Sequence, residues 1–549
     1  MRRRLFLIFI LIFTFAVAGC KISGTITDKD GAGVEGVTVY LAGEGEDGVG
    51  SIMAYTDSDG NYVFEGFHHG TLTITPDPES VEYKYIFKPE SGTVTVDLFA
   101  SAVVNFIAER QTEKDQNPSG MSYVPWSTFQ GNAYHTGYVT VYLNPDEFEP
   151  IWTWPHESDA LVPIHPVTAG DGKVLVTTAE DSGINLVIAL DSAGGAELWR
   201  YDFDVSYDID FISPPAYANG TVFIQSGAGD YSSYLWAFDA EESKPENAVF
   251  KMERYRNQSF QFYAPTLYEE EVNDVVNVGV YMGGSYRVEE ENSSFQEFGG
   301  VHCFRFDGLA LIERWQKPLA PFQQWTPAVN EKYVIAYTGP YSFNMDFDPL
   351  TVFDRSKGVE VFSIPDEGFV GNTEYSNMNL APVLGSYDNV IVINGGRLIS
   401  FDLDPDPLTR NGWEISKDAA AVEGFIGQPS VANGTIYAIY EGSLHARDEF
   451  DGTFIWEWPP PDENEDGNND ENGDVYIDDR FPMLVTDNLI FVGTESATNG
   501  STTYAIDLDS KTVVWSYPAA GHLALSNDGM LFIATPEGEL HAISTIATE

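Results

Sequence analysis

An aspartate followed eight residues later by a large aromatic residue recurs through most of the chain, and this repeat is the feature that most constrains the fold. Five copies keep this spacing: Asp191 and Trp199, Asp307 and Trp315, Asp354 and Phe362, Asp448 and Trp456, and Asp507 and Trp515. Two copies have longer turns, from Asp239 to Phe250 and from Asp402 to Trp413. Such internal repetition indicates one supersecondary unit used many times.

A second repeated element precedes the aspartate in each unit. It consists of a proline, a short strand, a tight glycine turn and another strand, as in PVTAGDGKVLV from Pro166, PAYANGTVFI from Pro215 and PSVANGTIYAI from Pro429. Each unit is therefore expected to form four antiparallel strands. The aspartate would cap its own turn, and the aromatic residue would pack against the neighbouring sheet. Four-stranded sheets repeated every ~40–60 residues are typical of propeller blades.

The two ends of the repeat region predict how the ring closes. The last stretch, LALSNDGMLFIATPEGELHAIS, supplies three strands and lacks the tryptophan strand. PIWTWP at 150–155 contains Trp152 and has no strands of its own before it. Pairing the two segments completes an eighth blade and removes open sheet edges. The alternative is an open or seven-bladed arrangement. The predicted fold class is all-β, with a small β-sandwich followed by an eight-bladed propeller at residues 126–546.

The pattern A-x-D-x-x-x-G-x-x-x-W at Ala189–Trp199 and again at Ala446–Trp456 resembles the tryptophan-docking motif of quinoprotein-like propellers. The segment WSTFQGNAYHTGY from Trp126 resembles the opening of the same family. The resemblance implies structural docking for six tryptophans: Trp152, Trp199, Trp315, Trp413, Trp456 and Trp515. It also leaves open a dehydrogenase dependent on pyrroloquinoline quinone and calcium. Those enzymes often carry an adjacent-cysteine disulfide, whereas this chain has two cysteines, Cys20 and Cys303, far apart.

The residues before the propeller divide into three predicted segments. Residues 1–19 combine three arginines with an apolar run too short to cross a bilayer, which is typical of a signal peptide. The run ends in Val-Ala-Gly-Cys, which resembles a bacterial lipobox with Cys20 as the lipidated residue. By the same resemblance, Lys21 after the cysteine favours the outer membrane of a diderm bacterium. The alternative is an ordinary signal peptide with a chance cysteine.

Residues 20–108 alternate short strands with Asp-Gly turns at Asp30 and Asp59, which predicts a small all-β module. The strings DKDGAGVEGVTVYL and TDSDGNYVFEGF resemble the carboxypeptidase-regulatory-like, prealbumin-type β-sandwich. That resemblance implies a spacer or adhesion unit with no active site. A polar linker at residues 109–125 follows it.

The charge of the chain limits its partners. There are 84 acidic and 28 basic residues, for a formal net charge of −56. Nucleic acids and anionic headgroups bind through Lys and Arg, so nucleic-acid binding is not expected. The nine histidines form no HExxH arrangement, and no GxSxG or CxxC motif occurs.

One acidic insertion, PPPDENEDGNNDENGDVYIDD at 459–479, carries oxygen ligands at alternate positions. Asp462, Asn464, Asp466 and Asp470 fit part of a calcium loop, but Gly473 stands where a bidentate glutamate is required. A solvated acidic loop is the alternative interpretation. No cofactor is expected beyond calcium at this loop.

The function predicted from the sequence is a lipid-anchored binding or scaffold protein of the cell envelope, without catalysis. Its protein partners would engage the loop face of the propeller, and the membrane would be reached through the lipid at Cys20. Two alternatives remain at this point: the quinone- and calcium-dependent dehydrogenase, and a surface adhesin or glycan-binding protein.

Overall fold

Two compact units make up the chain, Met1–Ser119 and Gly120–Glu549. The computed structural model describes residues 20–28, 33–34, 36–43, 52–67, 70–76, 85–88, 92–96, 101–110, 126–155, 161–179, 184–203, 209–228, 233–241, 249–252, 264–272, 275–289, 295–319, 326–338, 348–370, 381–404, 412–417, 423–461, 475–496 and 500–546. Within these residues, no helix is long and apolar enough to cross a membrane.

The N-terminal unit is a two-sheet β-sandwich. One sheet contains β4 (Asn61–Phe67), β1 (Cys20–Asp28), β9 (Phe106–Arg110) and β6 (Tyr85–Lys88), with β8 (Ser101–Val103) also paired to β1. The other contains β3 (Ile52–Tyr55), β2 (Thr38–Gly43), β5 (Gly70–Pro76) and β7 (Gly92–Val96). Alternation places Ile22, Val39, Leu41 and Ile74 in the core between the sheets, as period-two strands require. The predicted sandwich is confirmed.

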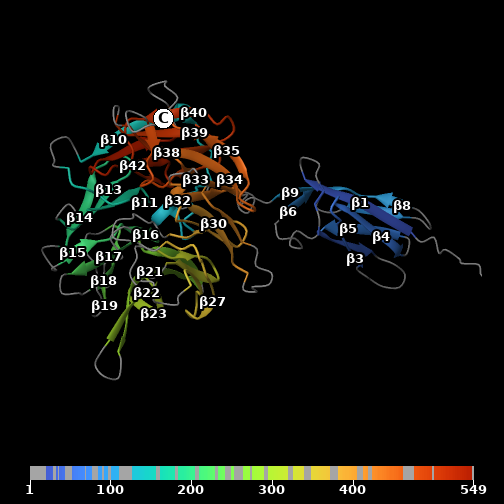
Figure 1. The fold of residues 1–549 in the computed structure, drawn as a ribbon, viewed down its shortest axis with the longest axis horizontal. Helices are drawn as coiled ribbons and strands as arrows, with labels where there is room; N and C mark the ends of the chain where they lie inside the picture. The colour runs from blue at the N-terminus through green and yellow to red at the C-terminus, as the bar shows by residue number, and fades with distance from the viewer. Residues whose placement is uncertain are drawn as a thin grey trace, which may run out of the picture. The chain divides into compact units, whose positions relative to one another are not determined.

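The C-terminal unit consists of eight antiparallel sheets arranged as propeller blades (Figure 1). Blade 1 contains β11 (Thr168–Gly170), β12 (Lys173–Thr177), β13 (Leu186–Asp191) and β14 (Glu197–Asp202). Blade 2 contains β15 (Ile209–Ile212), β16 (Ala216–Ala218), β17 (Thr221–Ala228), β18 (Ser233–Asp239) and β19 (Val249–Met252). Blade 3 contains β20 (Thr266–Val272), β21 (Val275–Glu289), β22 (Phe295–Phe306) and β23 (Leu311–Leu319). Blade 4 contains β24 (Ala328–Val329), β25 (Tyr333–Tyr337), β26 (Leu350–Asp354) and β27 (Glu360–Ile364).

The remaining blades follow the same order from the axis outward. Blade 5 contains β28 (Val383–Leu384), β29 (Asn389–Asn394), β30 (Arg397–Asp402) and β31 (Trp413–Ile415). Blade 6 contains β32 (Phe425–Ala432), β33 (Thr435–Tyr440), β34 (Ser443–Asp448) and β35 (Phe454–Trp458). Blade 7 contains β36 (Val475–Ile477), β37 (Leu484–Val485), β38 (Leu489–Ser496), β39 (Thr502–Asp507) and β40 (Val513–Tyr517).

Blade 8 closes the ring. It joins β41 (His522–Leu525), β42 (Met530–Ala534) and β43 (Leu540–Ser544) to β10 (Glu149–Trp154), which comes from the other end of the repeat region. β10 pairs antiparallel with β43, so that Trp152 lies opposite Ala542. In Figure 1, β10 lies beside the C-terminal strands. The predicted eight blades and the strand that closes the last one are confirmed.

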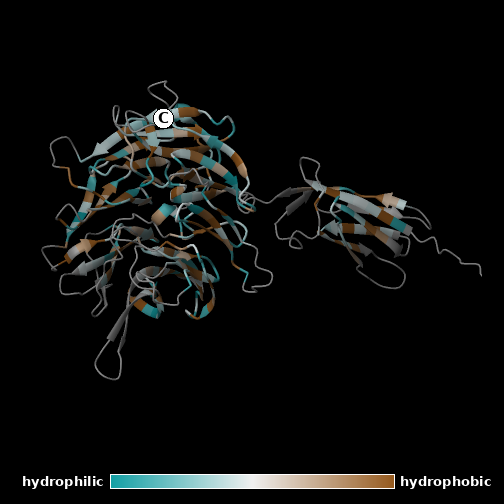
Figure 2. Cartoon of the chain, in the orientation of Figure 1, coloured by the Kyte–Doolittle hydropathy of each residue, from teal (hydrophilic) through white to brown (hydrophobic). Residues whose placement is uncertain are grey.

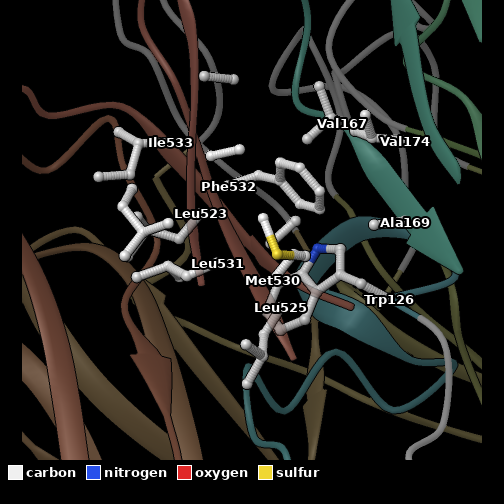
Figure 3. Packing of buried hydrophobic residues seen from close by; sticks show 14 of the residues in the cluster. Trp126, Val167, Ala169, Val174, Leu523, Leu525, Met530, Leu531, Phe532 and Ile533 are labelled. Atoms are coloured by element: carbon white, nitrogen blue, oxygen red, sulfur yellow. The ribbon is translucent and has the colours of Figure 1, made fainter. Parts of the chain in front are cut away.

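The core of the propeller lies between the blades. Figure 2 shows apolar and polar residues along the strands of the blades. Inner strands such as β12 and β42 are buried along their whole length, because both of their faces pack against neighbouring blades. The largest cluster joins blades 7, 8 and 1: Phe491, Leu531 and Val174 belong to it, and Trp126 packs into it from the segment before the blades (Figure 3).

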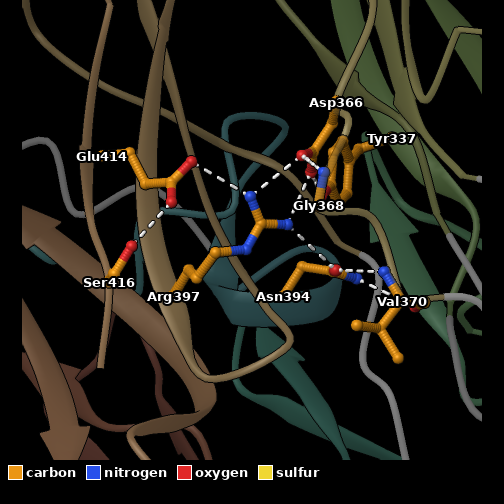
Figure 4. A network of polar contacts seen from close by, with 8 residues as sticks. All are labelled: Tyr337, Asp366, Gly368, Val370, Asn394, Arg397, Glu414 and Ser416. Atoms are coloured by element: carbon orange, nitrogen blue, oxygen red, sulfur yellow. Dashed lines mark hydrogen bonds and ion pairs between the residues drawn. The ribbon is translucent and has the colours of Figure 1, made fainter. Parts of the chain in front are cut away.

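A buried ion pair holds blades 4 and 5 together. Arg397 on β30 donates two hydrogen bonds of 2.9 Å to the carboxylate of Asp366, which follows β27 (Figure 4). The two side chains are 12% and 5% exposed. The same guanidinium also contacts Glu414, which is 43% exposed. Bidentate pairs of this kind are the strongest charge-assisted hydrogen bonds in proteins.

Candidate functional site at the ring axis

A single segment, residues 126–143, passes through the centre of the ring and touches the innermost strand of blade after blade. Its backbone bonds to Ala169 in blade 1, Tyr217 in blade 2, Val329 in blade 4, Leu384 in blade 5, Val431 in blade 6 and Val485 in blade 7. These distances are 2.7–3.1 Å. We call residues 126–143 the axial segment.

Side chains of the axial segment use the carbonyl groups of the repeat prolines. Thr128 Oγ1 donates to Pro265 O at 2.7 Å, and Gln130 Nε2 donates to Pro429 O at 3.0 Å. His135 lies 3.1 Å from Pro382 O through Nδ1 and 3.1 Å from Thr266 Oγ1 through Nε2. Thr266 belongs to blade 3, so these contacts reach one of the two blades, 3 and 8, that the backbone bonds omit. The sequence marks Pro429 as the start of a repeat but gives no sign that its carbonyl accepts a bond from the axial segment.

Asn488 fixes the end of the axial segment to blade 7. Its Oδ1 accepts a 2.9 Å hydrogen bond from the Leu143 amide, and its Nδ2 donates a 2.8 Å bond to the Leu143 carbonyl. One amide side chain thus satisfies both backbone groups of Leu143, as a neighbouring strand would.

The histidines at the axis are uncharged. Burial lowers the pKa of His135, His165 and His522 to about 4 in each case. His165 lies 3.0 Å from Ile212 O through Nε2, a carbonyl of blade 2. At neutral pH the centre of the ring is therefore lined by neutral polar groups rather than by ionised ones.

The predicted tryptophans lie at the boundaries between blades. The indole N–H of Trp152, Trp199, Trp315 and Trp413 donates to the carbonyl of Ser192, Ala240, Arg355 and Glu449, respectively, at 2.8–3.2 Å. Each acceptor is the residue directly after a repeat aspartate of the next blade. Lys511 lies over the Trp456 ring with Nζ 4.7 Å from the centroid, and Trp515 packs edge-on against Phe148 and Phe491.

The repeat aspartates cap the turns that accept these indoles. Gly194 N donates to Asp191 Oδ2 at 2.7 Å, and Phe450 N donates to Asp448 Oδ1 at 2.8 Å. At Asp507, backbone hydrogen bonding from Ser510 lowers the carboxyl pKa. This is the turn chemistry expected of aspartate.

The position four residues after the repeat aspartate is glycine in several blades, for a steric reason. Gly195, Gly358 and Gly452 have positive φ, and a Cβ there would come within 2.4–2.9 Å of the docked ring of Trp152, Trp315 or Trp413. In blade 7 the position is Lys511, which adopts φ 60°. A non-glycine residue with that backbone is uncommon.

Cys303 is a buried strand residue. It lies on β22 opposite Trp315 and is 4% exposed. Alanines occupy the matching position in blades 1, 6 and 7, opposite Trp199, Trp456 and Trp515. Burial raises the pKa of the Cys303 thiol to about 12, so the thiolate is suppressed.

Comparison with protein families identifies both units. The carboxypeptidase regulatory-like domain matches residues 21–107. The family described as outer membrane protein assembly factor BamB matches residues 136–245 and 312–546, which is more than half of the chain. The chain belongs to the BamB family of propellers. No curated protein matches the chain.

Solved structures similar to this BamB-family chain include three propeller proteins. BamB from Moraxella catarrhalis has 13% identity and a TM-score of 0.42, covering 72% of this chain and 99% of its own. Quinohemoprotein alcohol dehydrogenase ADHIIG from Pseudomonas putida HK5 has 12% identity and a TM-score of 0.34, covering 78% and 81%. Apo AztD from Citrobacter koseri has 11% identity and a TM-score of 0.36, covering 88% and 95%.

Among the residues that the structure describes, the lining of the axis does not fit pyrroloquinoline quinone. That cofactor carries three carboxylates, which require cationic partners. The cavity at the axis is lined by Trp126, Thr128, Phe129, Gln130, Pro166, Val167, Thr168, Pro214, Pro215, Ala264, Pro482, His522 and Leu523. None of these side chains is ionised at neutral pH, and the axial segment itself takes up the centre of the ring.

The remaining predicted site residues are Cys20 and the four calcium candidates. The backbone of Cys20 begins β1 and pairs with Phe67, within the regulatory-like domain. The calcium candidates Asp462, Asn464, Asp466 and Asp470 lie outside the described residues. Among the residues that are described, no group of three or more His, Cys, Asp or Glu is placed to hold a metal ion.

Proposed function

We propose that this protein is a lipid-anchored scaffold of the cell envelope that binds protein partners through the outside of its propeller. The observation that carries the proposal is the axial segment. It bonds to the inner strands across the ring, and so assigns the axis a structural role. The surfaces left for recognition are the outer strands and the loops that join them. Membership of the BamB family supports protein binding at this level.

The outer edge of blade 6 is the docking surface that we propose. Phe450, Phe454 and Ile455 are 52%, 47% and 48% exposed on one turn and on β35, and we call these three residues the blade 6 patch. β35 is the outermost strand and pairs with β34. Exposed aromatic side chains supply large contact areas at protein interfaces. A partner with an apolar anchor fits this patch.

Site-directed photocrosslinking in the native host tests the patch. A benzophenone-bearing phenylalanine analogue at position 450 is expected to give one dominant adduct, identified by mass spectrometry. The matched control is position 309, where Leu309 is 80% exposed on the equivalent turn of blade 3. Equal, diffuse labelling from both positions would remove the blade 6 patch from the proposal.

The anchor has a separate test. In the proposal, Cys20 carries the lipid and the regulatory-like domain acts as a spacer between the membrane and the propeller. Cys20→Ala should move the protein from the membrane fraction to the soluble fraction, because a short apolar leader without the lipid does not hold a protein in a bilayer. Retention of Cys20→Ala in membranes after carbonate washing would contradict it.

Adhesion to a glycan is the second candidate, favoured by one face of the sandwich. Tyr40 and Met53 are directly opposite each other on β2 and β3, and Tyr55 lies two residues from Met53. These side chains are 37%, 57% and 63% exposed. Sugar rings stack on such aromatic faces. Loss of polysaccharide retardation in affinity electrophoresis on Tyr55→Ala, with no change on Val103→Ala, would support adhesion.

A further inference from the structure

The residue that we propose to carry the lipid is itself the first residue of the folded regulatory-like domain. β1 begins at Cys20, whose backbone pairs with Phe67 at the end of β4. After an irregularity between Cys20 and Lys21, the register with β4 continues without a break. A terminal segment that is paired in a sheet is held in place, unlike a free terminus. No flexible tether therefore separates the proposed anchor from the sheet.

The start of β1 is held too firmly to act as a tether by peeling away. β1 lies in the middle of its sheet, paired with β4 on one side and with β8 and β9 on the other. Ile22 is fully buried, and Val104 N donates a 2.9 Å hydrogen bond to Ser23 O. Releasing residues 20–23 would break these pairings and expose Ile22 to water, which is unfavourable.

The register of β1 shows which residues lie beside the anchor. Ser101, at the start of β8, is opposite Lys21, and both residues are exposed. A lipid attached to Sγ of Cys20 reaches the headgroups through a single side chain, so this end of the sheet would lie at the bilayer surface. The ammonium group of Lys21 suits the phosphate groups found there.

The chain leaves the domain at the opposite end. β1 runs away from Cys20, and Asp28 lies opposite Ala108 of the parallel strand β9, which ends at Arg110. At ~3.3 Å per residue, the path from Cys20 to Asp28 and on to Arg110 covers about 33 Å. In Figure 1, β8 and β9 lie toward opposite ends of this domain. The domain therefore extends over its full length between the proposed anchor and the linker.

We infer that the regulatory-like domain stands end-on against a phospholipid bilayer, and that Lys21, Phe67 and Ser101 belong to the end that contacts the headgroups. The inference rests on the proposed lipidation of Cys20, and it names the lipid surface as the partner of this end of the domain. The linker then begins about 33 Å above the headgroups, a height set by the lengths of β1 and β9. A domain on a flexible tether would have no such fixed height.

Three exposed residues on one face of this sheet serve as a ruler for the test. Ser101, Val103 and Ile107 are all exposed, and they pair with odd-numbered residues of β1, which share one face. Their partners on β1 lie progressively further from Cys20. Positions 101 and 107 differ in height by about 20 Å.

A bimane label on a cysteine introduced at each position reports contact with the headgroups. The protein is produced in a bacterial host that processes lipoproteins, with Cys303→Ala as the background. It is reconstituted into vesicles of phosphatidylethanolamine and phosphatidylglycerol that carry a nitroxide on the headgroup, which quenches bimane only at short range. We expect strong quenching from Ser101→Cys, weaker quenching from Val103→Cys and loss of quenching from Ile107→Cys. Equal quenching at the three positions, or the reverse order, would overturn the end-on contact.

A variant with a long, flexible Gly-Ser insert between Cys20 and Lys21 is the matched control. It keeps the lipid but separates it from β1, so it should stay in the membrane with an unchanged melting temperature and lose the difference among the three positions. An unchanged order of quenching in this variant would contradict the inference that direct attachment orients the domain. Intact-mass measurement separates the two proposals: absence of the lipid from the wild-type protein would refute the anchor and this inference together, whereas a lipidated protein with equal quenching would refute the end-on contact alone.

Discussion

The indole N–H of Trp152 donates a 2.9 Å hydrogen bond to the carbonyl oxygen of Ser192, and this bond crosses the boundary where the ring closes. Trp152 lies on β10 of blade 8, whereas Ser192 follows β13 in blade 1. The same bond recurs from Trp199 to Ala240 between blades that are consecutive in the chain. The closing boundary is therefore built like the ordinary ones.

Substitutions at Trp152 should weaken the closing boundary. Trp152→Phe loses the hydrogen bond and part of the ring, which should lower the free energy of unfolding by about 1–2 kcal/mol, and Trp152→Ala by about 3 kcal/mol. Urea denaturation measures both. Ile151→Ala, on the same strand and 38% exposed, serves as the control and should change the free energy by less than about 0.5 kcal/mol. Equal effects at the two positions would contradict a specific role for the indole.

A side chain at Gly452 should be costly. Its φ is +74°, and a Cβ would lie 2.9 Å from the Trp413 ring. Gly452→Ala should therefore lower the free energy of unfolding by about 1–3 kcal/mol through backbone strain and displacement of Trp413. Gly220→Ala is the comparison, because that glycine has φ +73° but no atom within 4 Å of the added Cβ. A similar loss in both variants would mean that strain alone, without the indole, accounts for the effect.

Arg397 contacts one buried carboxylate, Asp366, and one exposed carboxylate, Glu414. Removing each in turn shows how much the burial of an ion pair contributes to the free energy of unfolding. Asp366→Ala leaves a buried guanidinium without its bidentate partner and should lower the free energy of unfolding by about 3–5 kcal/mol. Glu414→Ala removes a 3.0 Å contact from the same arginine, but Glu414 is 43% exposed, so a change below about 1 kcal/mol is expected. Thermal and urea unfolding of the two variants check the contrast. A larger loss from Glu414→Ala would contradict it.

Acid should destabilise the propeller through its axial histidines. Burial lowers the pKa of His165 to about 4 in the folded protein. Between pH 6.5 and about 4, His165 is therefore protonated in the unfolded chain but neutral in the folded one, which favours unfolding. Stability should fall as the pH drops from 6.5 to about 4, by about 3 kcal/mol for this histidine. His165→Gln, which keeps a donor for Ile212 O, should flatten the dependence over that window. An unchanged slope would show that other groups dominate acid unfolding.

Replacing Asn488 tests how much its two hydrogen bonds to Leu143 stabilise the protein. Asn488→Ala leaves the amide and the carbonyl of Leu143 without partners in a buried position, which should lower the free energy of unfolding by about 2–4 kcal/mol. Asn144, the residue after Leu143, caps a short 3-10 helix on the surface. Asn144→Ala should therefore lower the free energy of unfolding by about 1 kcal/mol or less. Hydrogen exchange of the Leu143 amide should rise in the first variant and stay slow in the second.

Most of the fold could be predicted from the repeat, because its aspartates, glycines and tryptophans each have the same structural role in several blades. Asp448 caps a turn, Gly452 leaves room for a ring, and Trp413 of the preceding blade fills that room. The path of the axial segment was not predictable in the same way. Its bonds run to backbone groups such as Pro429 O and Val485 N, which every residue possesses, so no residue type in the sequence marks the partner.

The axial segment has a consequence for biogenesis. Residues 126–143 leave the ribosome before any blade does, yet one of their hydrogen-bond partners is Asn488 in blade 7. Likewise, β10 can pair only after β43, near the other end of the repeat region, has been synthesised. Such distant pairings form late, because long loops must close before the contacts repay the lost entropy. A chain that ends within blade 8 would lack the pairing of β10 with β43. The ring of blades around the axial segment would then stay open. Premature termination would therefore yield a protease-sensitive chain rather than a smaller working propeller.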